Sequence, residues 1–196
     1  IISLCAAAGR PNMVFEFAST SKITFPGAGI SVMASSEENI AYMEKLISAQ
    51  TISYDKINQL RHVRFLKDRA HTVELMKRHA TIMAPKFHMV LHMLRAELTN
   101  KGIAHWHHPT GGYFVCVAAM PGTAKRTLEL CRRAGVKLTE AGATYPYGVD
   151  PLDSYIRIAP SLPPIEELEK AMEVFCVSLK LAALEKFLGM TFTELE

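Results

Sequence analysis

The sequence predicts an α/β fold. Segments with hydrophobic residues at helical spacing alternate along the chain with short apolar runs of strand length, and this alternation is typical of layered α/β domains. The chain has 196 residues, of which 49% are hydrophobic. That is enough to bury a core in one or two domains.

The first predicted elements surround a turn. Residues 14–18 and 30–34 are apolar runs that predict two strands, and Pro26 and Gly27 lie in the turn between them. Ser35-Ser-Glu-Glu38 has the spacing of a capping box and predicts the start of a helix. The apolar residues of that helix recur at helical spacing: Ile40, Met43, Leu46 and Ile47.

A long helical stretch follows the polar segment 50–55 and runs to about Asn100, with Gly102 as its stop. Pro85 lies within this stretch and predicts a kink or an interruption, because proline donates no backbone hydrogen bond. The second half carries one apolar stripe, formed by Phe87, Val90, Leu91, Leu94 and Leu98.

The last third of the chain predicts a small α/β layer. A hairpin is expected from residues 103–107 and 113–117, which flank a Pro/Gly segment. The further predicted elements are a helix over 123–134 closed by Gly135, short strands at 136–138 and 155–159, and a final helix opened by Pro163-Pro164.

Composition and charge exclude several classes of protein. The net charge of +3 is small and the basic residues are dispersed, which argues against nucleic acid or a charged membrane as partner of this segment. No apolar run approaches the ~20 residues of a membrane-spanning helix, and the first residues lack the basic start of a signal peptide. The four cysteines have no metal-type spacing, so we expect buried thiols in a reducing, cytoplasmic compartment: Cys5, Cys116, Cys131 and Cys176.

Lys22 is the strongest candidate for a chemical role. It follows Ser19, Thr20 and Ser21 at the end of an apolar run that includes Phe17. An amine among apolar neighbours loses its proton more easily, and a neutral amine forms a Schiff base with a carbonyl group. The hydroxyls of Ser19 and Ser21, with nearby backbone N–H groups, can bind a phosphate. The alternative is a lysine that only ends an edge strand.

Arg157 is the second candidate. It lies among apolar and small residues in the predicted strand 155–159, where an unpaired charge is costly to bury. A guanidinium group can bind a carboxylate through two parallel hydrogen bonds. The residues alone leave two partners open, the carboxylate of a ligand or that of an acidic residue in a structural ion pair.

Two histidine pairs have spacings that could hold a metal. His88 and His92 are four apart on a helix, and His105 and His107 share one face of a strand. No carboxylate or cysteine completes either set, so we expect no metal site.

Several ordered segments resemble one known family. Residues 17–29, Phe-Ala-Ser-Thr-Ser-Lys-Ile-Thr-Phe-Pro-Gly-Ala-Gly, resemble the Schiff-base lysine motif of the class I/II aminotransferases, which are pyridoxal-phosphate (PLP) enzymes of fold type I. The segment is most similar to the branch that groups with the aminotransferase domains of MocR-type proteins. Further matching segments are 59–66, 111–114, 142–148 and 156–161.

The resemblance implies the C-terminal part of a fold type I PLP-dependent transferase. Residues 1–75 would finish the large PLP-binding domain and begin the interdomain helix, and residues 76–196 would form the small C-terminal domain. About half of the polypeptide would be missing on the N-terminal side. The resembling enzymes pair so that each subunit completes the other's cofactor site, which implies a homodimer in which Thr51–Ser53 reaches toward a neighbouring phosphate.

The resemblance also implies an activity, a PLP-dependent transfer of an amino group from an L-amino acid to a 2-oxo acid. Lys22 would be the Schiff-base lysine and proton carrier, Ser19, Ser21 and Lys22 would bind the cofactor, and Arg157 would bind the substrate's α-carboxylate. Many members carry a phosphate-binding arginine where Gly29 stands here. Two alternatives stay open, a PLP-dependent lyase or decarboxylase and the PLP-binding sensor domain of a MocR-type transcription regulator.

Overall fold

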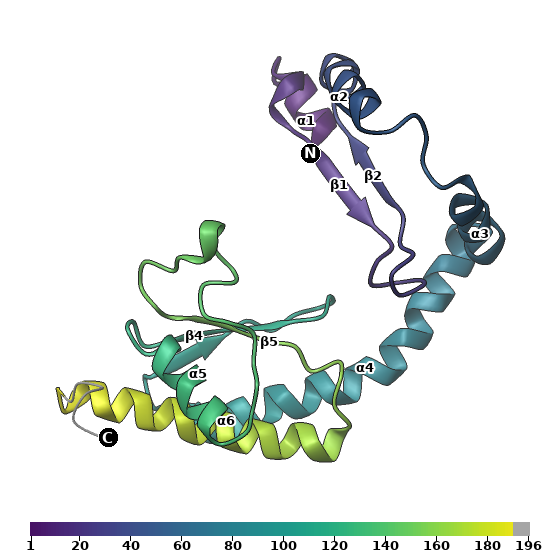
Figure 1. The fold of residues 1–196 in the computed structure, drawn as a ribbon. Helices are drawn as coiled ribbons and strands as arrows, with labels where there is room; N and C mark the ends of the chain where they lie inside the picture. The colour runs from purple at the N-terminus through teal and green to yellow at the C-terminus, as the bar shows by residue number, and fades with distance from the viewer. Residues whose placement is uncertain (190–196) are drawn as a thin grey trace. The chain divides into compact units, whose positions relative to one another are not determined.

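The computed structural model describes residues 1–189. The chain divides into two compact units, Ile1–His79 and a second unit that begins at Ala80. Helix α4 (Arg69–Leu98) contains this division as well as residue 75, after which the sequence analysis places the end of the first domain (Figure 1). Among residues 1–189, no helix combines the length and the apolar character needed to cross a membrane.

The first unit is built on two antiparallel strands. Strand β1 (Glu16–Ser19) pairs with β2 (Ser31–Ala34), so that Ser19 lies opposite Ser31. Both strands were predicted to within two residues. The remaining elements are helix α1 (Ile2–Ala7), a 3₁₀ turn (Pro11–Met13), α2 (Glu37–Gln50), α3 (Lys56–Leu66) and the first part of α4.

Helix α2 begins one residue later than the capping-box spacing indicates. Ser36 is the N-cap, and its Oγ accepts a hydrogen bond from Asn39 N at 3.2 Å. Ser35 Oγ instead donates to Val14 O at 2.6 Å. The hydroxyl that was expected to cap the helix therefore ties the helix start to the segment that precedes β1.

The predicted long helical stretch is two helices. Helix α3 ends at Leu66 because Lys67 has a left-handed φ of 56°. Helix α4 then runs without interruption through Pro85, so of the two predicted effects the interruption is wrong, and the kink stays a prediction. The burial of Val90 and Leu94 on its apolar face offsets the one hydrogen bond that Pro85 cannot donate.

The second unit is a three-stranded antiparallel sheet with helices on one side (Figure 1). Strand β4 (Val115–Ala119) lies between β3 (Ala104–Trp106) and β5 (Tyr155–Ile158), which confirms the predicted hairpin with its second strand two residues later. The helices are α5 (Ala124–Arg133), α6 (Ile165–Phe187) and the second part of α4, and a 3₁₀ turn (Pro146–Gly148) precedes β5.

Segment 136–138 is not a strand, in contrast to the prediction. Val136 N donates to Cys131 O at 2.8 Å and so completes the end of α5. The Val136 and Leu138 side chains pack against the core from this irregular segment. Their apolar character reflects this packing, because the residues have no strand partner in the sheet β3-β4-β5.

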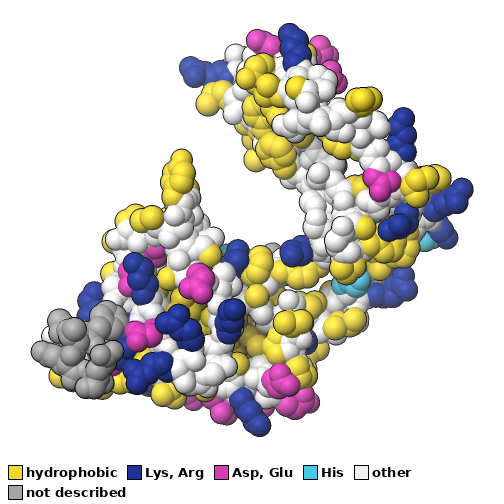
Figure 2. All heavy atoms as spheres, in the orientation of Figure 1, with side chains coloured by type: hydrophobic (Ala, Val, Ile, Leu, Met, Phe, Trp, Pro, Cys, Tyr) yellow, Lys and Arg dark blue, Asp and Glu magenta, His cyan; other side chains and the backbone are white. Residues whose placement is uncertain are grey.

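The hydrophobic core belongs to the second unit. It joins α4, the sheet and α6 through Leu94, Val117, Ile156, Phe175 and Leu179, each at most 1% exposed. In Ile1–His79, by contrast, His62 is the single buried side chain. Large apolar side chains stay exposed there (Figure 2), among them Phe17, Ile52, Ile57, Val63 and Met76.

Candidate active site

Lys22 lies in a turn directly after β1, and its side chain is exposed. Thr20 N donates to Ile30 O, and Ile30 N donates to Thr20 Oγ1, both at 2.9 Å, which closes the loop 20–30 at its base. Ile23 N and Thr24 N both donate to Thr20 O, at 2.8 and 2.9 Å, and this forms the turn around Lys22. We expected Lys22 to be partly desolvated by apolar neighbours. In this chain it is not, because the neighbouring Phe17 is itself 74% exposed and does not cover it.

The Ser19 and Ser21 hydroxyls lie on either side of Thr20 and point to one another. Their oxygens are 2.6 Å apart, and Ser21 N donates to Ser19 Oγ at 3.1 Å. Both residues are exposed, so a phosphate could reach both hydroxyls and accept hydrogen bonds from them. The structure thus brings the Ser19 and Ser21 hydroxyls together, next to Lys22 in the chain. That these residues bind a cofactor stays a prediction.

Gly29 explains why a phosphate-binding arginine does not fit at its position. A Cβ built on Gly29 would lie 2.8 Å from Ser21 Oγ and 3.0 Å from Ser21 Cα. Any residue other than glycine would bring this atom with it, so an arginine would displace Ser21. Because Gly29 has no side chain, the Ser21 hydroxyl can keep its position beside it.

Helix α3 holds the loop through polar side chains that the sequence analysis did not identify. His62 Nε2 lies 2.8 Å from Thr24 Oγ1 and 3.2 Å from Thr20 Oγ1. One turn earlier, Asn58 Nδ2 donates to Ala28 O at 2.9 Å. Asn58 and His62 are four residues apart and share one face of the helix. The spacing of four between Asn58 and His62 is the sign of this role that the sequence contains.

Aromatic contacts extend the same helix face. The Phe25 ring lies with its centre 5.3 Å from that of His62 and 4.9 Å from that of Phe65. The Arg61 guanidinium carbon lies 5.5 Å from the centre of the Phe25 ring, within the range of a cation–π interaction. Residues 58, 61, 62 and 65 thus contact the loop at four of its residues, Thr20, Thr24, Phe25 and Ala28.

Arg157 lies on β5, opposite Cys116 on β4. Its guanidinium carbon is 4.3 Å from the centre of the Phe114 ring. Its Nε is buried and has no hydrogen-bond partner, and no carboxylate of residues 1–189 forms an ion pair with it. A structural ion pair within residues 1–189 therefore does not account for Arg157, and the binding of a ligand carboxylate stays a prediction. Arg157 belongs to the second unit and Lys22 to the first.

Asp150 fixes the start of the strand that carries Arg157. Its Oδ2 accepts hydrogen bonds from Ser154 N and Tyr155 N at 2.8 Å, and its Oδ1 accepts one from Leu152 N at 3.0 Å. Desolvation raises the pKa of this carboxyl group, but the three backbone hydrogen bonds outweigh it, and the net pKa is lowered. The carboxylate form therefore orders the start of β5.

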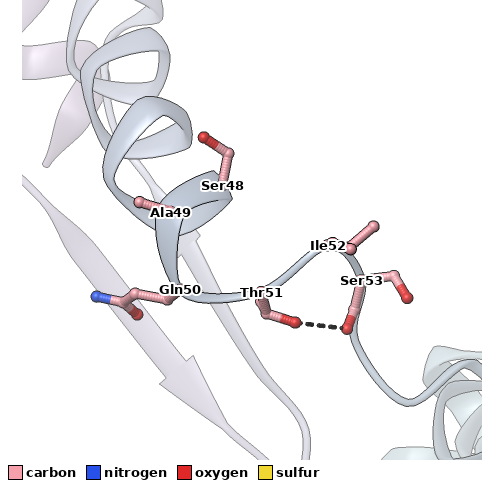
Figure 3. Close-up of a pocket in the computed structure, with 6 residues that line it drawn as sticks. All are labelled: Ser48, Ala49, Gln50, Thr51, Ile52 and Ser53. Atoms are coloured by element: carbon pink, nitrogen blue, oxygen red, sulfur yellow. Dashed lines mark hydrogen bonds between the residues drawn. The ribbon is translucent and has the colours of Figure 1, made fainter.

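The segment Thr51–Ser53 lies at the carboxyl end of α2. Figure 3 shows the open pocket that Ser48–Ser53 line, with Thr51 Oγ1 donating to Ser53 O at 2.8 Å. The carboxyl end of a helix carries partial negative charge, which disfavours a phosphate. Within this chain the segment therefore has no anion-binding geometry, and its reach toward a partner's phosphate stays a prediction.

Metal-binding clusters are not found in the described part of the chain: no three His, Cys, Asp or Glu side chains of residues 1–189 form a possible metal site. All four cysteines are thiols. Cys131 and Cys176 are buried, and desolvation raises the pKa of Cys176 to about 12. Cys5 and Cys116 are only half-buried, contrary to the expectation, because α1 has no core beneath it and Cys116 lies beside Arg157.

Comparison with known proteins assigns the family. Residues 1–191 match the family described as aspartate amino-transferase. A Mycolicibacterium smegmatis protein, provisionally named an aminotransferase, is 46% identical over 189 residues, which are 96% of this chain and 44% of that protein. The crystal structure of an aspartate transaminase from Corynebacterium glutamicum has 44% identity and a TM-score of 0.89, over 95% of this chain and 44% of that chain.

A more distant structure shares the fold alone. It is the Thermus thermophilus α-aminoadipate aminotransferase LysN, complexed with N-(5′-phosphopyridoxyl)-L-leucine, with 19% identity and a TM-score of 0.74 over 92% of this chain and 45% of that chain. The chain therefore belongs to the aspartate amino-transferase family and has the mixed α/β fold of its members. It spans less than half the length of the relatives it matches.

Proposed function

We propose that the longer protein to which this chain corresponds is a PLP-dependent aminotransferase acting on an L-amino acid and a 2-oxo acid. One observation carries the proposal: a chain of the aspartate amino-transferase family presents the exposed Lys22 beside the paired hydroxyls of Ser19 and Ser21. This chain would supply the C-terminal part of a fold type I enzyme, with residues 1–75 in the PLP-binding domain and 76–196 in the small domain.

The donor set fits PLP and an amino-acid substrate. Ser19 and Ser21 offer two hydroxyls to a phosphate, and Gly29 leaves Ser21 in place. The Arg157 guanidinium group forms no ion pair within residues 1–189, so it can take the α-carboxylate of a substrate as its counter-ion. The Phe114 ring beneath the guanidinium group restricts its orientation.

Each residue then has a distinct role in the reaction. PLP, when bound, supplies an electron sink for the Cα of the amino acid. The Lys22 amine would hold the cofactor covalently. Once the substrate's amino group has displaced it, the freed Lys22 amine would accept the proton from Cα and donate it to C4′ of the cofactor. Arg157 binds the α-carboxylate and so fixes the direction of the Cα–H bond. Because Lys22 is exposed in this chain, its desolvation must come from the rest of the protein or a partner subunit.

The names of the relatives favour a transaminase over the alternatives. Lys22 and Arg157 would equally serve a PLP-dependent lyase or decarboxylase, or a MocR-type sensor domain. The relatives at 44% and 46% identity, however, carry aminotransferase names. We also expect a homodimer, because the resembling enzymes pair, and a cytoplasmic location, because the cysteine pattern fits a reducing compartment.

Reduction with borohydride tests the role of Lys22. The full-length protein is incubated with PLP, reduced and digested, and the labelled peptide is expected to contain Lys22. Lys22→Arg should lose the label, while Lys45→Arg, which changes an exposed lysine on α2, should keep it. Formation of a 2-oxo acid without ammonia or carbon dioxide identifies transamination. Labelling of another lysine, or release of either gas, would contradict the proposal.

A further inference from the structure

We infer that His62 is a positioning residue for Lys22. It ties Thr20 and Thr24, which flank the lysine, to helix α3 and so fixes the turn from which Lys22 projects. The inference rests on the proposed function, because it matters to catalysis only if Lys22 is the reactive amine. Neither the motif around Lys22 nor the family match assigns a role to this histidine.

The burial of His62 is unusual for its surroundings. Its side chain is 1% exposed, and it is the single buried side chain of Ile1–His79. The apolar residues next to it in the sequence, Val63 and Leu60, are 65% and 45% exposed. The His62 ring is therefore held by its hydrogen bonds and by its edge contact with Phe25, and no hydrophobic core surrounds it.

The partners of the ring determine which nitrogen carries the proton. His62 Nδ1 lies 2.9 Å from Asn58 O, and a carbonyl oxygen can only accept, so Nδ1 is the donor. In the neutral ring Nε2 is then an acceptor. Thr24 Oγ1 at 2.8 Å and Thr20 Oγ1 at 3.2 Å can both donate to it. His62 Nε2 thus contacts both Thr20 and Thr24, the residues before and after segment 21–23.

The same two threonines form the turn itself. Thr20 O accepts from Ile23 N and Thr24 N, and Thr20 Oγ1 accepts from Ile30 N at 2.9 Å. Without the Nε2 acceptor, the Thr24 hydroxyl can still donate to Thr20 O at 3.2 Å, and the Thr20 hydroxyl to Ile30 O at 3.4 Å. The turn would then keep its local bonds but lose its link to α3 at this point.

Such a link matters because the lysine side chain is long. Four rotatable bonds separate its amine from the backbone, so the backbone must be rigid for the amine to reach a defined place. A displacement of about 1 Å in an active site can cost on the order of 100-fold in rate. A histidine that fixes residues 20 and 24 therefore acts on catalysis without touching substrate or cofactor.

Four variants separate this role from a general effect on folding. His62→Asn keeps a group near Nδ1 but no acceptor near Nε2, whereas His62→Gln can place an oxygen near Nε2. Thr24→Val removes the partner hydroxyl with little change in shape. His88→Asn is the control, because His88 is an exposed histidine on α4.

Hydrogen exchange in the cofactor-free, full-length protein gives the first measurement. His62→Asn and Thr24→Val should raise exchange of the amides of residues 20, 23, 24 and 30 by about tenfold, the effect of losing one hydrogen bond of about 1 kcal/mol. His62→Gln and His88→Asn should exchange as the wild type does. Wild-type exchange at these amides in both His62→Asn and Thr24→Val, or an equal rise over all of residues 1–79, would overturn the inference.

The second measurement is the rate at which PLP attaches to Lys22. His62→Asn and Thr24→Val should attach PLP about tenfold more slowly, with kcat reduced and KM for the amino donor little changed, and His62→Gln should restore both. If the wild type attaches PLP to another lysine, the proposed function fails, and the role of His62 with it. If the wild type attaches PLP to Lys22 and the two variants do so at the wild-type rate, only the role of His62 is overturned.

Discussion

Gly29 controls how closely the two sides of the lysine loop approach. Its missing side chain leaves room for Ser21, whose Oγ would lie 2.8 Å from an added Cβ. Gly29→Ala should displace the Ser21 hydroxyl and weaken PLP binding by about tenfold, the loss of one hydrogen bond to a charged group. A titration followed by PLP absorbance would measure this.

Gly111→Ala is the matched control, because an added Cβ there meets no atom within 4 Å. Gly29→Arg should bind PLP no better than Gly29→Ala, since it carries the same Cβ. An unchanged dissociation constant in Gly29→Ala would show that Ser21 does not contact the phosphate.

Arg157 is expected to act on the substrate and not on the cofactor. Arg157→Ala should lower kcat/KM by the equivalent of about 2–5 kcal/mol, typical for removing one partner of a buried charge pair. Arg157→Lys should recover only part of the loss, because an ammonium group cannot form two parallel hydrogen bonds. Steady-state kinetics measure both, with the exposed Arg132→Ala as control. Wild-type kcat/KM in Arg157→Ala would refute the role.

The sequence located the candidate residues but not their environment. Lys22, Ser19 and Ser21 are neighbours in the chain, so a local motif was enough to place them together. His62 is 38 residues from Thr24, and no local pattern predicts a hydrogen bond over that separation. The apolar neighbours of Lys22 also misled the prediction of its environment, because Phe17 points to solvent and does not cover the amine.

At the scale of helices and strands, the spacing of apolar residues predicted an element well where those residues are buried in the core. The stripe on α4 is buried as expected at Val90, Leu94 and Leu98. The break between α3 and α4 was missed because Lys67, a residue type that rarely adopts positive φ, makes it at 56°. Pro85 does not interrupt α4, because tertiary packing decides whether a helix continues.

The start of β5 should be sensitive to acid through Asp150. The folded pKa of its carboxyl group lies below the ordinary value of 3.8, so its stabilising effect is present above that value and is lost as the pH falls through the folded pKa. Asp150→Ala should lower the free energy of unfolding at neutral pH by about 1 kcal/mol, after allowance for solvent screening.

Denaturant unfolding at several pH values checks this prediction. The difference between the wild type and Asp150→Ala should shrink below about pH 4. Asp153→Ala is a useful comparison, because Asp153 also accepts a backbone hydrogen bond, from Lys125 N at 3.0 Å, but lies on the α5 side. A stability difference that is constant down to acid pH would contradict a role for the Asp150 charge.

For the molecule as a whole, the hydrophobic core is unevenly distributed. The second unit contains every buried apolar side chain of residues 1–189, and Ile1–His79 contains none. A segment of that length without a core has little apolar burial to offset its conformational entropy. Its exposed apolar side chains would be covered if further chain or a second subunit packed on them.

Hydrogen exchange of the isolated 196-residue chain tests this contrast. Amides in α6 and in β4 should exchange at least about 100-fold more slowly than those in α2 and α3, because only the former belong to a packed core. In the full-length protein, the amides of α2 and α3 should become protected. Equal protection of both units in the isolated chain would show that Ile1–His79 is stable without further contacts.

The bond between Thr24 and His62 also has a consequence for the order of folding. It joins residues separated by 38 positions, and closing a segment of that length costs entropy before any contact forms. The strand pair β1–β2 and helix α3 must therefore be in place before the turn around Lys22 is linked to α3. If this link is what fixes the position of Lys22, we expect a newly made chain to acquire its cofactor after folding and not during it.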